Sequence, residues 1–158
     1  MRILIIDDDA GLRKSLSLIL DDAGYDVVQA EDGQAGLETA REQLPDIILC
    51  DVRMPKLGGL EFLEAYSEAG GEALVLMMTA YGSLDLAVEA MKRGAYDYLP
   101  KPFGADEVLL TVRKAEEREQ LRRRARIERA RLRHRQSGLR RAVHTPQVAA
   151  AALYTVRQ

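Results

Sequence analysis

The sequence predicts an α/β fold: a five-stranded parallel sheet, doubly wound by helices, with a helical extension at its C-terminal end. Five short apolar runs recur within the first 118 residues, and stretches with helical spacing of apolar residues separate them. The runs are continuous rather than alternating, which is typical of parallel strands that are buried on both faces. Beyond residue 118 the alternation stops and the chain becomes rich in arginine.

The first part of the alternation predicts strands over 3–6, 25–30 and 47–50 and helices over 12–20 and 33–43. The strands are short runs of mainly aliphatic residues. In the first helix apolar residues recur every three or four positions, and Gly24 follows as a stop signal. The second helix must end before Pro45, because proline cannot continue a helix.

The second part predicts helices over 57–69 and 84–93, strands over 73–78 and 96–99, and a fifth helix that begins near Ala105. The helix over 57–69 follows Pro55 and a Gly58-Gly59 turn. Gly94 stands where a helix C-cap is expected after 84–93. The last strand ends at a Pro-Lys-Pro sequence, which cannot extend a strand.

The net charge of −2 hides a division of the chain. Residues 1–118 carry a net charge of −11, and residues 119–158 carry +9. Such asymmetry indicates two segments with different roles. We expect a domain over 1–118, an Arg-rich helical linker over 119–141 and the start of a further module over 142–158. Ala125, Leu132 and Leu139 recur every seven residues, but the companion positions are Leu121, Glu128 and Arg135, so a dimerising coiled coil is only weakly indicated.

Composition excludes several classes of protein. The single cysteine, Cys50, cannot form an internal disulfide or a structural zinc site, and we expect it in the core. No apolar run approaches the ~18 residues that a membrane span needs, and no signal-peptide pattern opens the chain. No Gly-rich Lys-Ser/Thr phosphate loop is present, so ATP hydrolysis by that route is excluded. We therefore expect a soluble, cytoplasmic protein that does not act on a membrane.

Polar residues follow four of the five strands, where parallel sheets bind ligands. They are Asp7 and Asp8, Asp51, Thr79 and Lys101. Clustered carboxylates repel one another unless a cation neutralises them, and a set of oxygen ligands favours Mg²⁺. A carboxylate beside Mg²⁺, a lysine and a hydroxyl forms a phosphoryl-transfer site. Taken singly, each residue is equally consistent with a cap or a turn.

Four motifs at these strand ends resemble the signatures of response-regulator receiver domains. They are Ile5-Ile6-Asp7-Asp8-Asp9, Leu49-Cys50-Asp51-Val52-Arg53-Met54-Pro55, Met78-Thr79-Ala80 and Leu99-Pro100-Lys101-Pro102-Phe103. The resemblance covers residues 1 to about 118 and implies a flavodoxin-like fold of the receiver type. The stretches 79–83 and 94–99 more narrowly resemble receivers of the NtrC-like class, which precede an ATPase that activates sigma-54 polymerase and a DNA-binding helix-turn-helix.

The resemblance implies a role for each matched residue. Asp51 would be the phosphoacceptor. The Mg²⁺ ligands would be Asp8 directly, Asp7 mainly through water, Asp51 itself and the backbone carbonyl of Arg53. The phosphoryl group would be bound by the Thr79 hydroxyl, the Ala80 N–H and Lys101. Tyr98 would be an aromatic switch residue that moves with Thr79, and the bond before Pro102 would be cis. Asp9 lies outside the matched metal pair, and we expect it to cap or turn the first helix.

The implied function is that of a two-component response regulator. A sensor histidine kinase would donate the phosphoryl group, and the protein would catalyse its own phosphorylation and dephosphorylation without being an enzyme in the usual sense. Phosphorylation would switch a homodimer surface on helix four, strand five and helix five, together with the linker. By position that surface would include six residues: Ala87, Val88, Met91, Arg93, Tyr98 and Val112. The tail lacks a base-reading element, so DNA or polymerase contact would come only through missing output domains.

Three alternatives compete with this interpretation. An aspartate-nucleophile phosphohydrolase also has an Asp-x-Asp after its first strand, but Gly11 stands where a Thr or Val is wanted, and Asp51 and Thr79 would have no role. A flavin-binding module would need a polar phosphate loop where this chain has three acids. A receiver-like interaction module that is not phosphorylated is consistent with the sequence, although every expected site residue is present.

Overall fold

The computed structural model describes residues 1–80 and 82–143, with side chains to residue 141. It contains five strands and five helices in strict alternation. The strands are β1 (Arg2–Ile6), β2 (Asp26–Ala30), β3 (Ile47–Asp51), β4 (Leu74–Thr79) and β5 (Asp97–Pro100). The helices are α1 (Ala10–Asp22), α2 (Gly33–Gln43), α3 (Gly59–Glu68), α4 (Leu84–Lys92) and α5 (Ala105–Val143). The predicted α/β fold is confirmed, and the predicted bounds differ by only a few residues.

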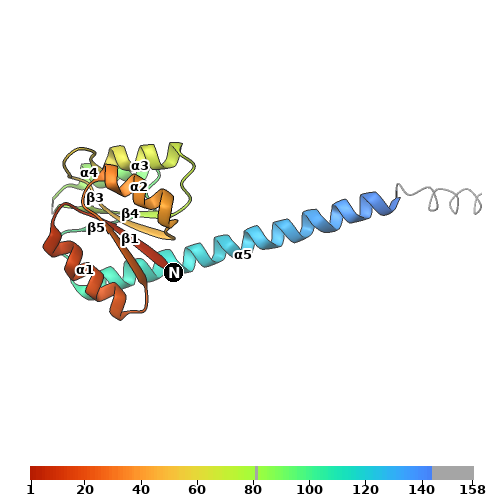
Figure 1. Ribbon diagram of the computed structural model, residues 1–158, viewed down its shortest axis with the longest axis horizontal. Helices are drawn as coiled ribbons and strands as arrows, with labels where there is room; N and C mark the ends of the chain where they lie inside the picture. Colours follow the sequence, from red (N-terminus) through yellow and green to blue (C-terminus); the bar gives the residue numbers. More distant parts are fainter. Residues whose placement is uncertain (81, 144–158) are drawn as a thin grey trace, which may run out of the picture. The chain divides into compact units, whose positions relative to one another are not determined.

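The five strands form one parallel sheet in the order β2-β1-β3-β4-β5. Its two faces are covered by different helices, as Figure 1 shows. Side chains of α1 and the first turns of α5 pack on one face, with Ile3, Leu16 and Val112 fully or almost fully buried. Helices α2, α3 and α4 cover the other face, around Leu4 and Phe62. Burial on both faces explains why the strands are continuous apolar runs.

Helix α5 runs without a break from Ala105 to Val143. Its second half is rich in arginine, alanine and leucine, which are strong helix formers, and no proline lies between Pro102 and Pro146. The chain divides into two compact units, Met1–Glu119 and Gln120–Gln158. The assignment of roles to 119–141 and 142–158 stays a prediction, and residues 144–158 lie outside the described part of the chain.

Burial settles the expectation about Cys50. Cys50 is fully buried, as are Met77 and Met78 beside it in the sheet, so its place in the core is confirmed. In the described part of the chain, no helix has both the length and the apolar character that a bilayer crossing requires.

Candidate functional site

Three aspartates converge where β1 and β3 end. The two strands are paired, with Ile6 opposite Cys50, so the residues that follow them, Asp7 and Asp51, are neighbours at the same edge of the sheet. Asp7 is 1 % exposed and Asp51 is 8 % exposed, whereas Asp8 lies open to solvent. Two buried carboxylates and one exposed carboxylate therefore share the rim at which parallel sheets bind ligands.

The geometry of this carboxylate cluster fits a small divalent cation. One carboxylate oxygen from each of Asp7, Asp8 and Asp51 lies within 4.8 Å of the other two. Oxygens held at about 2.1 Å from an octahedral Mg²⁺ ion are about 3 to 4 Å apart, so small side-chain movements suffice to close the site. Among the residues that the structure describes, this is the group of carboxylates placed to hold such an ion.

Lys101, which directly follows the edge strand β5, bridges the two buried carboxylates. Its ammonium lies 3.0 Å from Asp7 Oδ2 and 3.3 Å from Asp51 Oδ1. Its backbone N–H donates to the carbonyl oxygen of Thr79 at 2.6 Å, which ties the end of β5 to the end of β4. The peptide bond that follows, Lys101-Pro102, is cis, as the resemblance implied.

The loop after β1 positions the first aspartate. The Asp9 N–H donates to Asp7 Oδ1 at 2.9 Å, and the Arg13 guanidinium donates to the Asp7 carbonyl oxygen at 2.7 Å. Asp9 itself caps α1, because its side chain accepts a hydrogen bond from the N–H of Leu12 at 3.1 Å. The prediction that Asp9 is a helix cap is confirmed, and this role keeps it separate from the carboxylate cluster.

Burial and the charge of Asp7 act together at Asp51, and Lys101 opposes them. Burial, and after it the neighbouring charge of Asp7, raises the pKa of the Asp51 carboxyl, and Lys101 offsets only part of that rise. Burial opposes the charged form of Lys101, but hydrogen bonding to Asp7 and the charge of Asp51 outweigh it and raise the pKa of the ammonium. The site therefore holds a surplus of negative charge that an added cation would relieve.

Helix α3 approaches the back of this site so closely that only glycine fits. A Cβ on Gly59 would overlap the carbonyl oxygen of Asp51 and lie 2.8 Å from the Cα of Val52. The Gly59 N–H donates to the Val52 carbonyl at 2.8 Å. The sequence indicated a Gly-Gly turn here, but it did not reveal that the helix N-terminus rests on the backbone of Asp51.

The remaining predicted site residues lie around the cluster rather than in it. Thr79 ends β4 and is 2 % exposed, and Ala80, which follows it, is exposed. Arg53 is exposed and follows Asp51 by two residues in the loop after β3. Tyr98 lies on β5, is 37 % exposed, and donates its backbone N–H to Asp97 Oδ1.

The predicted α4–β5–α5 surface is only partly as expected. Val88, Met91 and Tyr98 are exposed, but Ala87 is 2 % exposed and Val112 is fully buried. Those two assignments were wrong, because the helix faces that carry them pack on the sheet. Arg93 is paired on the surface with Glu89 at 3.0 Å and with Glu64 at 3.3 Å.

Comparison with known proteins gives consistent matches. The family model described as the response regulator receiver domain matches residues 3–113. The transcriptional regulatory protein ZraR of Escherichia coli is 43 % identical over 113 residues, which are 72 % of this chain and 26 % of that protein. The C4-dicarboxylate transport transcriptional regulatory protein DctD of Pseudomonas aeruginosa is 41 % identical over 115 residues, 72 % of this chain and 25 % of that protein.

Solved structures agree with these sequence matches. Brucella abortus NtrX superimposes with a TM-score of 0.75 and 32 % identity over 78 % of this chain and 28 % of its own. A response regulator receiver domain protein from Clostridium thermocellum has a TM-score of 0.72 and 32 % identity, over 76 % of this chain and 97 % of its own. The chain thus spans about a quarter of the length of ZraR, DctD and NtrX.

Proposed function

Because the chain belongs to the response regulator receiver domain family, we propose that it accepts a phosphoryl group on Asp51 from a sensor histidine kinase in a two-component system. The observation that carries this proposal is the convergence of three carboxylates and one ammonium at one edge of the sheet. No other arrangement in the described residues offers a nucleophile, a cation site and a phosphate partner together.

Each residue has a distinct task in the transfer. Asp7, Asp8, Asp51 and the backbone carbonyl of Arg53 would hold Mg²⁺, which supplies neutralisation of the phosphoryl oxygens when bound. The Asp51 carboxylate attacks the phosphorus of a phosphohistidine; the P–N bond breaks and an acyl phosphate forms. Lys101 exchanges its contact with the carboxylate for one with a phosphoryl oxygen, while the Thr79 hydroxyl and the Ala80 N–H donate to others.

Electrostatics explains why the reaction should need a divalent cation. Only the ionised carboxylate of Asp51 is a nucleophile, and burial together with Asp7 opposes its ionisation. A cation held by the same three carboxylates favours the ionised form, and it also reduces repulsion between the aspartate and the incoming phosphoryl group. Later attack by water on the acyl phosphate returns the protein to its starting state, so the receiver catalyses both its phosphorylation and its dephosphorylation.

The output of the switch follows from the exposed surface beside the site. Movement of Thr79 towards the phosphoryl group would open space for Tyr98, which is now exposed. Val88 and Met91 share the α4–β5–α5 surface with Tyr98, and we propose that this surface and the linker form a homodimer. We further propose that a longer protein containing this receiver controls sigma-54-dependent transcription in the cytoplasm. The likeness to ZraR, DctD and NtrX supports this proposal.

Intact-mass spectrometry after incubation with acetyl phosphate tests the phosphoryl transfer. Wild type with Mg²⁺ should gain one phosphoryl adduct, and Asp51→Asn or wild type with a chelator should gain none. The matched control is Asp22→Asn, which removes the same charge from an exposed position of α1 and should leave the adduct unchanged. An adduct on Asp51→Asn would show that another residue is the phosphoacceptor. If wild type gains no adduct, the protein would instead be a receiver-like interaction module that is not phosphorylated.

A further inference from the structure

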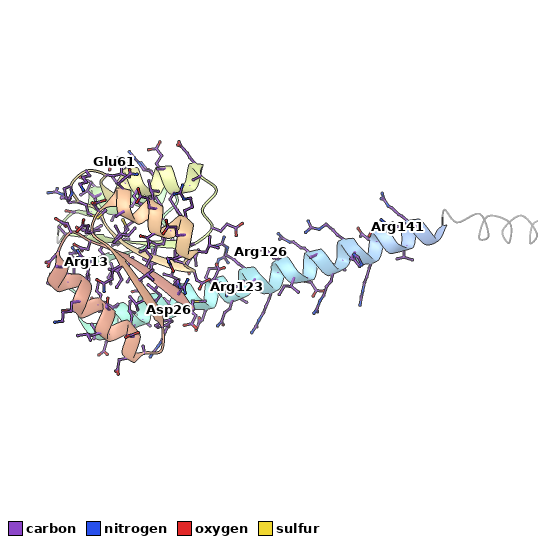
Figure 2. All side chains as sticks on the ribbon, viewed as in Figure 1. Arg13, Asp26, Glu61, Arg123, Arg126 and Arg141 are labelled. Atoms are coloured by element: carbon purple, nitrogen blue, oxygen red, sulfur yellow. The ribbon has the colours of Figure 1, made fainter. Side chains whose placement is uncertain are left out.

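The second half of helix α5 carries an unusual density of positive charge. Between residues 122 and 141 there are ten arginines and one acid, Glu128. Twenty residues of α-helix extend about 30 Å, so this segment presents a net charge of +9, about one charge per 3 Å. All ten arginines are exposed except Arg122, which is half-buried. Figure 2 shows the side chains of Arg123, Arg126 and Arg141 standing out from the helix.

Half of these arginines lie on one face of the helix, which we call the Arg face. Side chains at i, i+4, i+7, i+11 and i+18 lie one above another. The positions on the Arg face are Arg122, Arg126, Arg129, Arg133 and Arg140. Like charges at i, i+4 destabilise a helix. The segment carries ten guanidiniums and one carboxylate, so the Arg face is suited to a partner that brings many negative charges.

Three kinds of anionic partner can be compared. A second copy joined through Leu121, Leu132 and Leu139 brings further arginines beside these leucines, so its linker supplies no negative charge to the Arg face. A membrane-bound helix needs a broad apolar face with aromatic residues, and residues 120–141 have no aromatic side chain. Single-stranded nucleic acid is bound largely by stacking on aromatics, which are equally missing. Binding to a regular row of phosphates requires only positive charge on the protein.

We propose that the Arg face of α5 binds the phosphate backbone of duplex DNA without reading its sequence. Duplex DNA carries one negative charge per about 1.7 Å, and guanidinium binds phosphate through two parallel hydrogen bonds. The expectation that this chain does not bind DNA directly relied on its lack of a base-reading element. Contacts to the backbone need no such element, because they position a protein without specifying sequence.

Fluorescence anisotropy with a labelled 20-base-pair duplex tests this proposal on the full chain. About five phosphate contacts predict a slope of about −4.5 in log K against log salt, or a roughly 500-fold loss of affinity between 50 and 200 mM salt. Two duplexes of unrelated sequence should bind equally. Because the whole chain carries a net charge of −2, such binding requires a local surface and cannot come from net charge.

Two matched triple variants locate the surface. Arg126→Gln/Arg129→Gln/Arg133→Gln removes three charges from the Arg face with a residue that also favours helix. It should reduce the salt slope by about 2.7. The control Lys14→Gln/Arg41→Gln/Lys92→Gln removes three exposed charges from α1, α2 and α4 and should leave the slope unchanged. Circular dichroism confirms that each variant keeps its helix.

Several outcomes would overturn the proposal. These are no binding to duplex at 50 mM salt, equal weakening by the two triple variants, and strong preference for one of the two sequences. Binding to vesicles of anionic lipid without binding to duplex would assign the Arg face to a membrane instead. Salt-sensitive self-association without duplex binding would assign it to the acidic residues 1–118 of a second copy. None of these results depends on whether Asp51 is phosphorylated.

Discussion

Replacing Asp51 by asparagine should stabilise the metal-free protein, although it removes the proposed phosphoacceptor. The substitution keeps the size and shape of the side chain and removes one negative charge from a buried cluster. Burial and the charge of Asp7 both disfavour the ionised carboxylate, and Lys101 compensates only in part. Residues arranged for chemistry are thereby expected to cost folding stability.

The geometry gives the size of the effect. At an effective dielectric constant of about 20, an Asp7 oxygen within 4.8 Å of the Asp51 carboxylate repels it by about 3.5 kcal/mol or more. The Lys101 ammonium at 3.3 Å attracts it by about 5 kcal/mol. Taking the carboxylate out of water costs at least about 3 kcal/mol. The balance favours the neutral side chain by about 1.5 kcal/mol.

Urea unfolding at pH 7 with a chelator measures this difference. Asp51→Asn should unfold with a free energy about 1.5 kcal/mol above that of wild type, and the exposed control Asp22→Asn should stay within about 0.5 kcal/mol. Because the folded-state pKa of Asp51 is raised, the disadvantage of wild type should appear as pH rises through that pKa and vanish at lower pH. Saturating Mg²⁺ should stabilise wild type more than the variant.

The reasoning fails if Asp51→Asn is no more stable than wild type in chelator. It also fails if the difference between the two proteins does not change with pH, since the effect would then not come from ionisation of this carboxyl group. A gain equal to that of Asp22→Asn would assign the effect to net charge instead of to the cluster.

Three further predictions concern residues around the site. Gly59→Ala should lower the free energy of unfolding in urea by about 1 to 3 kcal/mol, because the added methyl group overlaps the backbone of β3. The control Gly138→Ala has open space around the added methyl group and should not destabilise the fold. Equal effects of the two substitutions would contradict the close approach of α3 to β3. Tyr25 donates a hydrogen bond to Glu116, and burial followed by this bond raises the pKa of Tyr25 to about 12. Ultraviolet titration of wild type should show a late-titrating phenol that Tyr25→Phe lacks, and the variant should lose about 1 kcal/mol of stability. Because the folded state favours the neutral phenol of Tyr25, that stabilisation is lost between pH 10 and 12. Burial, and the charges of nearby aspartates, raise the pKa of the Cys50 thiol, so a thiol reagent should modify it only in denaturant; rapid labelling of native protein would show that β3 is accessible.

The sequence was sufficient to predict the sheet and the composition of its functional edge. Continuous apolar runs such as Ile3–Ile6 identify buried parallel strands, and the carboxyl ends of such strands meet at one rim. The alternation therefore predicts that Asp7 and Asp51 share one rim, and the observed strand order, with β1 beside β3, makes them neighbours. The alternation also places Lys101 at this rim, but its ion pairs with both aspartates were not predicted.

Contacts between different helices and strands could not be predicted from the sequence. Ala87 and Val88 are adjacent apolar residues on α4, and only the packing of that helix decides that the first is buried and the second exposed. The Tyr25–Glu116 hydrogen bond joins residues 91 positions apart. The contact between Gly59 and the backbone of β3 depends on how far α3 descends onto the sheet, which no local pattern encodes.

Strand β3, which carries Asp51, lies in the middle of the five-stranded sheet, and all five of its residues are buried. Strand β5, which carries Tyr98, is an edge strand and is only partly buried. Amide hydrogens in the centre of a sheet exchange with solvent only when the whole domain unfolds, whereas those at an edge exchange through small local openings. Deuterium uptake should therefore be slowest in β3 and much faster in β5. Local openings of the edge strand should therefore leave the position of Asp51 unchanged.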